Sequence, residues 1–535
     1  MKKLGTFAIL LLLFLAPRPV RAASEFTTTF NSLYTITSLG QTSVTHTITL
    51  KNNLAHIYAT SYSIATSGDK ITGITASDEH GLLSTTTNTQ NGVTNIGLTI
   101  SNPSIGKDQV KTITLSYLTD DVVELIGNTM TINIPRLARA NEAESYTRVV
   151  RVEDVKDQTK LIYPEPNTIE PDGEYIKYTF VGHLADSLTL LFGDSVTYKL
   201  NLTYELKNKD LKPGDSELAL PSDTGYQHVL IASINPEPKS IRVDDDGNWL
   251  ARYNLKSQEK LVVEAELYVT VYPHPVLFDP SKKDSIKTSK SKYWDTSSDL
   301  VTTLAQRLRT PENIYRYLTD NFTYNYAGVS SGGNRLGALQ ALSSPTNVLC
   351  TEFTDSFVSL ARSLNIPARE INGYGYTKNR AVQPQNTTTD TLHAWPEYWS
   401  DTEKNWISVD PTWGNTTGGV DYFNKLDFSH ITFVRHGLED SYPLPAGAYK
   451  SNPESKYVQV EVAEDMPTEN IESYTKDQVL YNTGNVAIQS DAVGYLPPYG
   501  SFKIEESKSF SFYDKIRSIC AKLFSKFSLL LPASI

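Results

Sequence analysis

Apolar and polar residues alternate with a period of two over much of the first half of the chain. The alternation is clearest in four stretches, Val44–Leu50, Ile113–Tyr117, Val196–Tyr204 and Val263–Val271. Successive side chains of a strand point to opposite faces, so this pattern predicts antiparallel sheets with one packed face and one face in water. We expect two sandwich-like β modules, residues 23–120 and residues 121–272, with the boundary within Asp120–Leu125.

The pattern changes after residue 272. Residues 273–292 are rich in proline, serine and lysine, a composition that is well solvated and packs poorly, so we expect a linker. A helical period follows, and Thr310, Pro311 and Glu312 supply the N-cap, the N1 proline and the first-turn acid of a helix. A domain of a different kind is therefore expected over residues 293–436.

Short strand patterns return after residue 437, for example in Val458–Val462, and predict a small accessory β region over residues 437–500. The tail, residues 501–535, places apolar residues on one helical stripe from Phe512 to Phe527, with basic residues mostly off it. Such a helix suits contact with a membrane surface through residues 512–530. Docking of the same helix on the acidic protein itself is an equally open interpretation.

The first residues have the pattern of an export signal. Lys2 and Lys3 precede an apolar run that ends at Ala16, and a small-residue cleavage point follows Ala22. We therefore expect residues 1–22 to be removed and the protein to be secreted or associated with the cell envelope. The alternative is an uncleaved signal anchor, which the shortness of the apolar run disfavours.

Length, charge and cysteine content narrow the class of protein. A chain of 535 residues is too long for one hydrophobic core and should divide into roughly three or four domains. Its net charge of −11 offers no basic stripe for phosphates, which argues against nucleic-acid binding. The two cysteines, Cys350 and Cys520, are too few for a disulfide scaffold, although one long-range disulfide between them stays an alternative.

Cys350 stands at the start of a predicted helix. Phe353, Phe357 and Leu360 form its apolar stripe, and Pro367 follows its end. The partial positive charge of a helix N-terminus favours the reactive thiolate over the thiol. Cys350 is therefore a candidate nucleophile, with an inert packed cysteine as the alternative.

His393 and Asp410 flank a predicted β-hairpin. An even turn centred on Asp401 and Thr402 would pair Glu397 with Trp406 and therefore His393 with Asp410, on one face of the hairpin. A carboxylate at one ring nitrogen fixes the tautomer of an imidazole and leaves the other nitrogen to act as a base. The alternative is a purely structural His–Asp hydrogen bond, which the presence of Cys350 disfavours.

These residues resemble the transglutaminase-like superfamily, whose core is related to papain-type cysteine proteases. The similarity runs from about residue 309 to residue 436. It is carried by Cys350 ahead of its helix, Asn365–Arg369 leading to Gly373 and Tyr374, His393–Trp395, and Asp410–Thr412. The resemblance implies that Cys350, His393 and Asp410 are nucleophile, base and orienting acid. It also implies an α+β fold in which the cysteine helix packs on an antiparallel sheet.

Three positions depart from what the resemblance or the strand pattern leads us to expect. Val348 stands where the family usually has glycine, and Thr354 stands where a small residue is usual, so we expect a narrower acyl site. Pro396 lies within the histidine strand and lacks a backbone donor, so we expect a bulge or an edge position there.

The oxyanion hole is expected to use the backbone N–H of Cys350 and a second donor from Tyr324, Asn325 or Tyr326. Trp395 and Trp413 are candidates for the wall of the acyl groove, with a role in core packing as the alternative.

No cofactor and no metal are predicted. The stretch Asp421–Ile431 contains acids and His430 but lacks tight ligand spacing, so we interpret it as scaffold.

Two functions remain open at this point. The first is an exported cysteine enzyme that attacks amide bonds of proteins or peptides and passes the acyl group to water, as a protease or amidase does, or to an amine, as a cross-linking enzyme does. The second is a cell-surface binding or scaffold protein whose transglutaminase-like domain is idle and whose β modules bind the partner. A weaker third possibility is peptide or glycan processing in envelope assembly.

Overall fold

The computed structural model describes residues 25–504, with gaps at residues 69, 91–92, 136–142, 156–159, 183–186, 282–290, 331–334, 378–382, 385–391, 453–454 and 491–492. The expected export signal, Cys520 and the amphipathic stripe of residues 512–530 lie outside the described residues. Among the helices of the described part, none has both the length and the apolar character needed to cross a bilayer.

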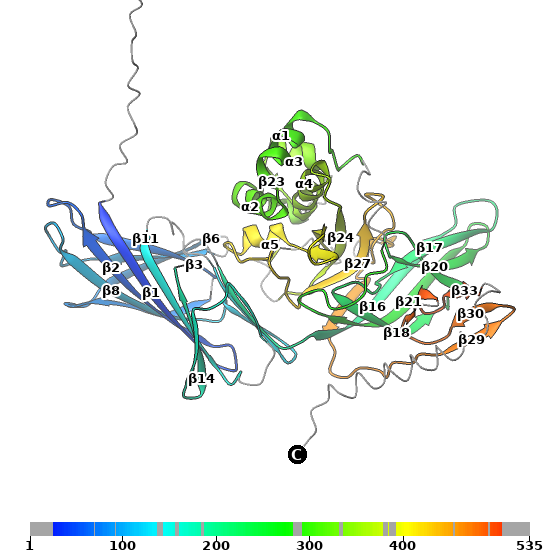
Figure 1. The fold of residues 1–535 in the computed structure, drawn as a ribbon, viewed down its shortest axis with the longest axis horizontal. Helices are drawn as coiled ribbons and strands as arrows, with labels where there is room; N and C mark the ends of the chain where they lie inside the picture. Colours follow the sequence, from blue (N-terminus) through cyan, green and yellow to red (C-terminus); the bar gives the residue numbers. More distant parts are fainter. Residues whose placement is uncertain are drawn as a thin grey trace, which may run out of the picture.

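The first β unit lies at one end of the molecule (Figure 1) and is built on an eight-stranded sheet. Its strands in spatial order are β13 (Thr168–Asp172), β14 (Tyr175–Val181), β11 (Ala143–Glu153), β1 (Phe26–Ile36), β2 (Thr42–Asn52), β8 (Val110–Thr119), β4 (Ile71–Asp78) and β5 (Gly81–Leu82). A second sheet contains β12 (Lys160–Tyr163), β15 (Leu188–Phe192), β10 (Thr129–Ile134) and β9 (Val123–Ile126). A third contains β3 (Ser61–Ser67), β7 (Val93–Thr99) and β6 (Ser84–Gln90).

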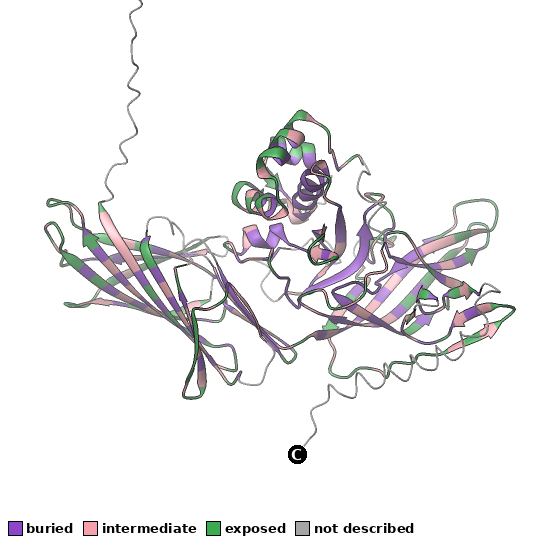
Figure 2. Cartoon of the chain, in the orientation of Figure 1, coloured by how far each residue is buried: buried purple, intermediate pink, exposed green. Residues whose placement is uncertain are grey.

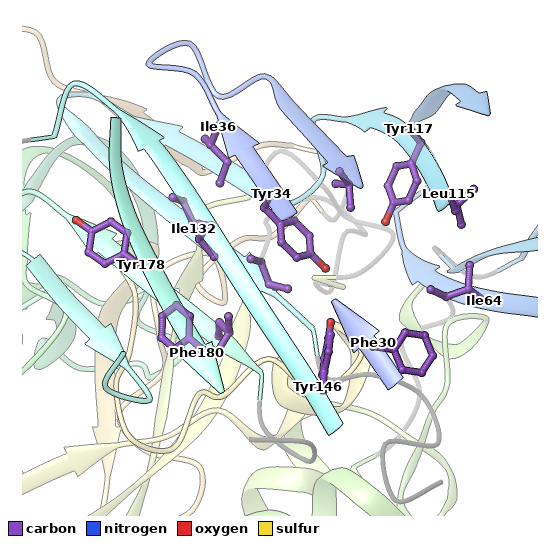
Figure 3. Packing of buried hydrophobic residues seen from close by; sticks show 14 of the residues in the cluster. Phe30, Tyr34, Ile36, Ile64, Leu115, Tyr117, Ile132, Tyr146, Tyr178 and Phe180 are labelled. Carbon is purple, nitrogen blue, oxygen red and sulfur yellow. The ribbon is translucent and has the colours of Figure 1, made fainter. Parts of the chain in front are cut away.

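The eight-stranded sheet runs across the boundary expected at residues 120–121. β1 pairs in parallel with β11, from Thr28 opposite Ala143 to Ile36 opposite Val152. Tyr34, Ile132 and Tyr178 lie in one buried hydrophobic cluster (Figure 3). The strand pairing therefore places the division between the two β units after β15. Local alternation does not reveal this, because a parallel pair joins segments that are distant in sequence.

The second β unit has two sheets. One contains β18 (Gln227–Asn235), β21 (Lys260–Val271), β16 (Val196–Lys207) and β28 (Val458–Val462), and the other contains β17 (Gly214–Leu220), β20 (Trp249–Leu255) and β19 (Ser240–Val243). β28 pairs with β16, from Tyr198 opposite Val462 to Leu202 opposite Val458. A strand of the expected accessory region thus completes this sheet, and the helical domain is an insertion between β21 and β28.

The rest of the accessory region forms two small sheets, β29 (Ser473–Lys476), β30 (Val479–Asn482) and β33 (Ser501–Lys503), and β31 (Ile488–Ser490) with β32 (Gly494–Leu496). Leu480, Leu496 and Ile504 share a small hydrophobic cluster there. The accessory region therefore extends past residue 500, into the first residues that we assigned to the tail.

The inserted domain combines helices with a four-stranded sheet. Its helices are α1 (Asp299–Leu308), α2 (Pro311–Asn321), α3 (Ala338–Ser343), α4 (Cys350–Ser363) and α5 (Pro411–Thr416), with a 3₁₀ turn η3 (Gly328–Ser330). The sheet order is β26 (Asn405–Ser408), β25 (His393–Ser400), β24 (Ala368–Gly375) and β27 (His430–His436), and β22 (Thr323–Tyr324) pairs with β23 (Thr346–Val348). The start of α2 is as predicted, because the Thr310 side chain accepts a hydrogen bond from the Asn313 backbone N–H at 3.2 Å.

The sheet of the inserted domain is buried on both sides. α4 packs against β25 and β24, and nearly every residue of α4 is buried (Figure 2). On the other side, Phe428, Ile431 and Phe433 belong to the hydrophobic cluster of the second β unit. The hydroxyl of Tyr198 also donates to the Phe428 carbonyl at 2.9 Å. The second β unit is thus the platform on which β27 rests.

Part of the segment expected as a linker is packed into the protein. Asp279 accepts from Arg369 Nη2 at 2.7 Å, and Ser281 Oγ lies 2.6 Å from Arg369 Nη1. The Arg369 side chain is fully buried and Asp279 is 6% exposed. Proline and lysine content alone predicts that the segment is solvated. Here, however, the buried ion pair of Asp279 with Arg369 fixes the part of the segment that contains Asp279.

Candidate active site

Cys350 begins α4 and is 7% exposed. The Glu352 carboxylate accepts the backbone N–H groups of Leu349 and Leu336, each at 2.9 Å, and so ties the first turn of the helix to the chain that precedes it. The Thr354 hydroxyl donates to the Cys350 carbonyl at 2.9 Å. The thiol is therefore held at the positive end of the helix dipole.

His393 and Asp410 come together as expected from the sequence. His393 Nε2 lies 2.8 Å from Asp410 Oδ2, and both side chains are fully buried. Asp410 is the N-cap of α5, where its Oδ1 accepts the backbone N–H groups of Thr412 at 2.8 Å and Trp413 at 3.0 Å. Burial acts to raise the pKa of Asp410, but the interaction with His393 and its other donors outweigh burial and hold that pKa below its usual range.

Cys350 lies next to the ring of His393. Burial acts to lower the pKa of His393, but Asp410 and then Cys350 act in the opposite direction and raise it from 6.5 to about 9. The second ring nitrogen, Nδ1, is buried and has no hydrogen-bond partner among the described residues. Nδ1 is thus the nitrogen left to exchange a proton with the thiol, as an imidazole oriented by a carboxylate does.

The predicted register of the hairpin is wrong by two residues. Glu397 pairs with Ser408 and Ser400 with Asn405, because the turn is centred on Thr402 and Glu403 and not on Asp401 and Thr402. β26 ends at Ser408, so Asp410 reaches His393 from the start of α5 and not from a strand. A shift of two residues keeps every side chain on the same face, which is why the predicted contact survives.

Pro396 lies neither at a bulge nor in an edge strand. β25 is flanked by β24 and β26, and the pairing of β24 with β25 has no register shift at Pro396. The Pro396 carbonyl accepts the Val409 N–H at 3.1 Å, so the backbone of Pro396 points to the side where β26 has already ended. The side of Pro396 that lacks the N–H therefore faces a position beyond the last residue of β26.

His430 is a member of the cluster that the sequence did not reveal. Its Nε2 lies 3.2 Å from Asp410 Oδ2, and its Nδ1 lies 2.7 Å from Asp427 Oδ1. Nitrogen and oxygen atoms of His393, Asp410 and His430 all lie within 4.8 Å of one another. We interpret them as a hydrogen-bond network, because the 2.8 and 3.2 Å separations from Asp410 are those of hydrogen bonds. The segment interpreted as scaffold thus reaches the site through β27, and only long-range sheet pairing could have shown this.

Aromatic rings enclose His393. The Trp413 ring is stacked on it at 4.9 Å and 16°, and the Trp395 ring lies at 5.7 Å and 29°. The indole nitrogens of both tryptophans are buried without a hydrogen-bond partner in the described part of the chain. These two residues therefore keep water from the imidazole, whether or not they also contact substrate.

The candidate oxyanion donors lie at different depths. Tyr324 is 6% exposed, and burial followed by the nearby Cys350 raises its pKa, so its hydroxyl keeps the proton. Tyr326 packs on Tyr324 with ring centroids 5.1 Å apart but is 39% exposed. The Asn325 side-chain oxygen accepts the Gly328 N–H at 2.8 Å. Of the three, Tyr324 is the buried hydroxyl donor beside Cys350.

A cleft of about 490 Å³ lies between the first β unit and the inserted domain. Gln383, Thr417, Val420 and Tyr422 form its wall on the inserted domain. The Tyr422 ring separates the cleft from His430, at a centroid distance of 6.2 Å. The cleft therefore approaches the network from the His430 side.

Comparison with known proteins identifies a family for one part of the chain. A model of the transglutaminase-like superfamily matches residues 295–411. The uncharacterized protein YebA of Bacillus subtilis (strain 168) is 25% identical over 220 residues, which cover 36% of this chain and 30% of that protein. The match thus spans less than a third of this relative.

Solved structures give weaker likenesses. A "putative cysteine protease" from Cytophaga hutchinsonii has a TM-score of 0.31 at 16% identity, covering 51% of this chain and 87% of that chain. The periplasmic domain of TgpA from Pseudomonas aeruginosa, bound to ethylmercury, has a TM-score of 0.23 at 15% identity, covering 41% and 91%. By the family match, residues 295–411, which contain Cys350, His393 and Asp410, form a transglutaminase-like core and belong to that superfamily.

Proposed function

We propose that this protein is an exported, cysteine-dependent enzyme that transfers acyl groups from amide bonds of proteins or peptides. The observation that carries the proposal is the arrangement of His393. One ring nitrogen is bonded to Asp410 at 2.8 Å, and the other has no partner and belongs to a ring that Cys350 contacts. A base oriented in this way beside a thiol at a helix N-terminus is the arrangement needed for nucleophilic catalysis.

The reaction begins when the Cys350 thiol gives its proton to His393 Nδ1 and the sulfur attacks the amide carbonyl carbon. The carbon–nitrogen bond breaks, the protonated His393 returns the proton to the leaving amine, and a thioester to Cys350 remains. Water or a second amine then attacks the thioester carbonyl carbon and gives its proton to His393. The carbon–sulfur bond breaks, and His393 returns the proton to the Cys350 sulfur as the acid or the new amide leaves. The backbone N–H of Cys350 and the Tyr324 hydroxyl would stabilise the oxyanion in both steps.

The choice between water and an amine as acceptor depends on access to the thioester. Trp395 and Trp413 are 1% and 0% exposed, so the imidazole is shielded from bulk water. Shielding of this kind lets a bound amine compete with water. Both acceptors belong to the proposal, and the experiment below separates them.

An idle transglutaminase-like domain in a surface binding protein is the second candidate. The observation that favours it is the burial of the nucleophile, since Cys350 is only 7% exposed. In this case the β units would hold the partner. A thiol that reacts no faster than a model thiol near neutral pH would support this candidate over the enzyme.

Export is part of the proposal and is supported by the pattern of residues 1–22. Lys2 and Lys3, the apolar run and the small residues before position 23 have the order of a secretory signal. Sequencing of the N-terminus of the protein recovered outside the cytoplasm tests this. A chain that starts at Met1 and stays in the cytoplasm would refute it.

The enzymatic proposal is tested with the full chain carrying Cys520→Ser, so that Cys350 is the remaining cysteine. The protein is incubated with a casein substrate and a fluorescent primary amine, with Cys350→Ala in the same background as the control. Cys350-dependent release of peptides indicates hydrolysis, and Cys350-dependent labelling of casein indicates transfer to the amine. Equal signals from both proteins would overturn the enzymatic proposal.

A further inference from the structure

A second histidine extends the candidate site away from Cys350. Asp427 Oδ1, His430 Nδ1, His430 Nε2 and Asp410 Oδ2 follow one another at 2.7 Å and 3.2 Å, and Asp410 Oδ2 continues to His393 Nε2 at 2.8 Å. The side chains of His430, Asp410 and His393 are fully buried, and Asp427 is 6% exposed. His430 lies beyond residues 295–411, the part that matches the superfamily model.

Two carboxylates face the two ring nitrogens of His430. Carboxylates accept hydrogen bonds, so both contacts are satisfied only when His430 donates from Nδ1 to Asp427 and from Nε2 to Asp410. Asp410 then has donors at both oxygens: two backbone N–H groups at Oδ1 and two imidazoles at Oδ2. A carboxylate held in this way has little freedom to rotate.

The strand that carries His430 is itself fixed. β27 pairs with β24, and Thr432 exchanges hydrogen bonds with the Gln227 side chain of the second β unit, through its N–H at 2.8 Å and its carbonyl at 2.9 Å. Asp427 also accepts the Ser429 N–H at 2.8 Å. His430 is therefore anchored to the β platform, independently of the helices that hold Cys350.

We propose that His430, held by Asp427, is a positioning residue that fixes the Asp410 carboxylate and, through it, the ring of His393. The inference rests on the proposed function of the Cys350–His393–Asp410 site. Because the second β unit supports β27, the proposal gives this unit a role in orienting His393, the base.

Other titratable groups surround His430 and bear on its charge. Asp410, Asp427 and His393 face it directly, and the Tyr422 ring lies 6.2 Å away. Asp427 also acts on the neighbouring Tyr198, on β16, and on Lys425, and Glu124, on β9, acts on Tyr422 and Tyr198. Asp410 and Asp427 together raise the pKa of His430 from 6.5 to about 9 against the effect of burial, which agrees with a doubly protonated ring.

The test uses the full chain with Cys520→Ser and needs no substrate. His430→Leu removes both donors at similar volume, whereas His430→Gln keeps an amide donor that can reach Asp410. His436→Leu is the matched control, because His436 is a buried histidine on the same strand that contacts Glu370 and Pro443 and not Asp410. The readouts are the rate of Cys350 alkylation by iodoacetamide and the titration of His393, followed by NMR of labelled histidine rings and assigned with His393→Gln.

We expect His430→Leu to slow alkylation near neutral pH by roughly tenfold to a hundredfold, by analogy with the loss of a hydrogen-bond partner that orients a metal-binding histidine. The titration of His393 should move to lower pH, since Asp410 is no longer held against it. His430→Gln should recover most of the rate, and His436→Leu should lower stability without moving the titration.

Three results would overturn the inference. In the first, the His393 titration moves to higher pH in His430→Leu, as it would if His430 acted only as a nearby positive charge. In the second, His436→Leu has the same effect as His430→Leu. In the third, the purified protein holds stoichiometric zinc that His430→Leu loses. If His393→Gln leaves the alkylation rate unchanged, the proposed function fails as well. This variant therefore distinguishes failure of the proposed function from failure of the role of His430 alone.

Discussion

The Asp410 carboxylate has two structural roles: it lies 2.8 Å from His393, and it caps the N-terminus of helix α5. An asparagine at this position retains the oxygen that caps α5, but its amide group donates toward the imidazole. The ring must then present an acceptor at Nε2 and carry its proton on Nδ1, where it no longer accepts the thiol proton. We expect Asp410→Asn to lower amide turnover by roughly 10⁴-fold with the fold retained.

Steady-state turnover and the thermal unfolding midpoint check this expectation. Asp421→Asn is the control, because Asp421 also caps backbone N–H groups, of Phe423 and Asn424, but has no contact with the network. If Asp410→Asn and Asp421→Asn lose the same fraction of activity, the loss is caused by the change in backbone capping and not by a change in the orientation of His393.

The raised pKa of His393 predicts how stability changes with pH. The pKa of His393 is about 9 in the folded protein against its ordinary value of 6.5, so the folded state holds the proton more tightly. The stability from this charged ring is therefore fully present below about pH 6.5 and is lost as the pH rises through about 9, by at most about 1.4 kcal/mol per pH unit. Urea unfolding of the wild type and of His393→Gln measures this, and a stability difference that is equal at about pH 6 and about pH 9.5 would contradict it.

Replacement of Arg369 should show how much stability is lost when a buried ion pair is broken. Its guanidinium lies 2.7 Å from both Asp279 and Glu397 and 4.1 Å from the centre of the Trp406 ring. Arg369→Met leaves Glu397 without its cation and leaves Asp279 with Arg435, 3.4 Å away, so we expect a loss of about 3–5 kcal/mol in the free energy of unfolding. Denaturant titration provides the value.

Arg316→Met is the control for this prediction. Arg316 pairs with Glu312 at 3.0 Å on the surface of α2, where both side chains are about half exposed. An exposed pair contributes about 0–1 kcal/mol. Similar losses in the two variants would show that burial of the Arg369 cluster is not what sets its contribution.

Replacement of Val348 tests whether a bulky side chain two residues before Cys350 narrows the acyl site. Its side chain is fully buried and belongs to the hydrophobic cluster that contains Phe353 and Trp413, so it points into the core. Val348→Ala should therefore lower the free energy of unfolding by roughly 1–3 kcal/mol and leave the rate of Cys350 alkylation unchanged. A rate that rises severalfold would show that Val348 does restrict access to the thiol.

Local sequence was enough to predict several local features of the candidate site. The N-cap signals of α2, the helix start at Cys350 and the contact of His393 with Asp410 all follow from short motifs or from alternation. The contact between His393 and Asp410 is present although the predicted register was wrong. A shift by an even number of residues leaves each side chain on the same face of its strand.

Features set by distant segments could not be predicted. The parallel pairing of β1 with β11 joins residues more than a hundred positions apart and shifts the division between the β units. The pairing of β24 with β27 brings His430 to Asp410, although nothing near His430 in sequence indicates it. Periodicity reports which face of a strand is buried, whereas the choice of neighbouring strand depends on the whole fold.

The pairing of β28 with β16 has a consequence for the synthesis of the chain. The sheet of the second β unit needs Val458–Val462 as its edge strand, and the whole domain containing Cys350 is translated before that strand. The domain containing Cys350 is therefore complete in the sequence before the strand that pairs with the open edge of β16. Closing such a long loop is slow, because the entropy of the intervening chain is lost before the contact forms. Until Val458–Val462 pairs with β16, this open edge can accept a wrong strand.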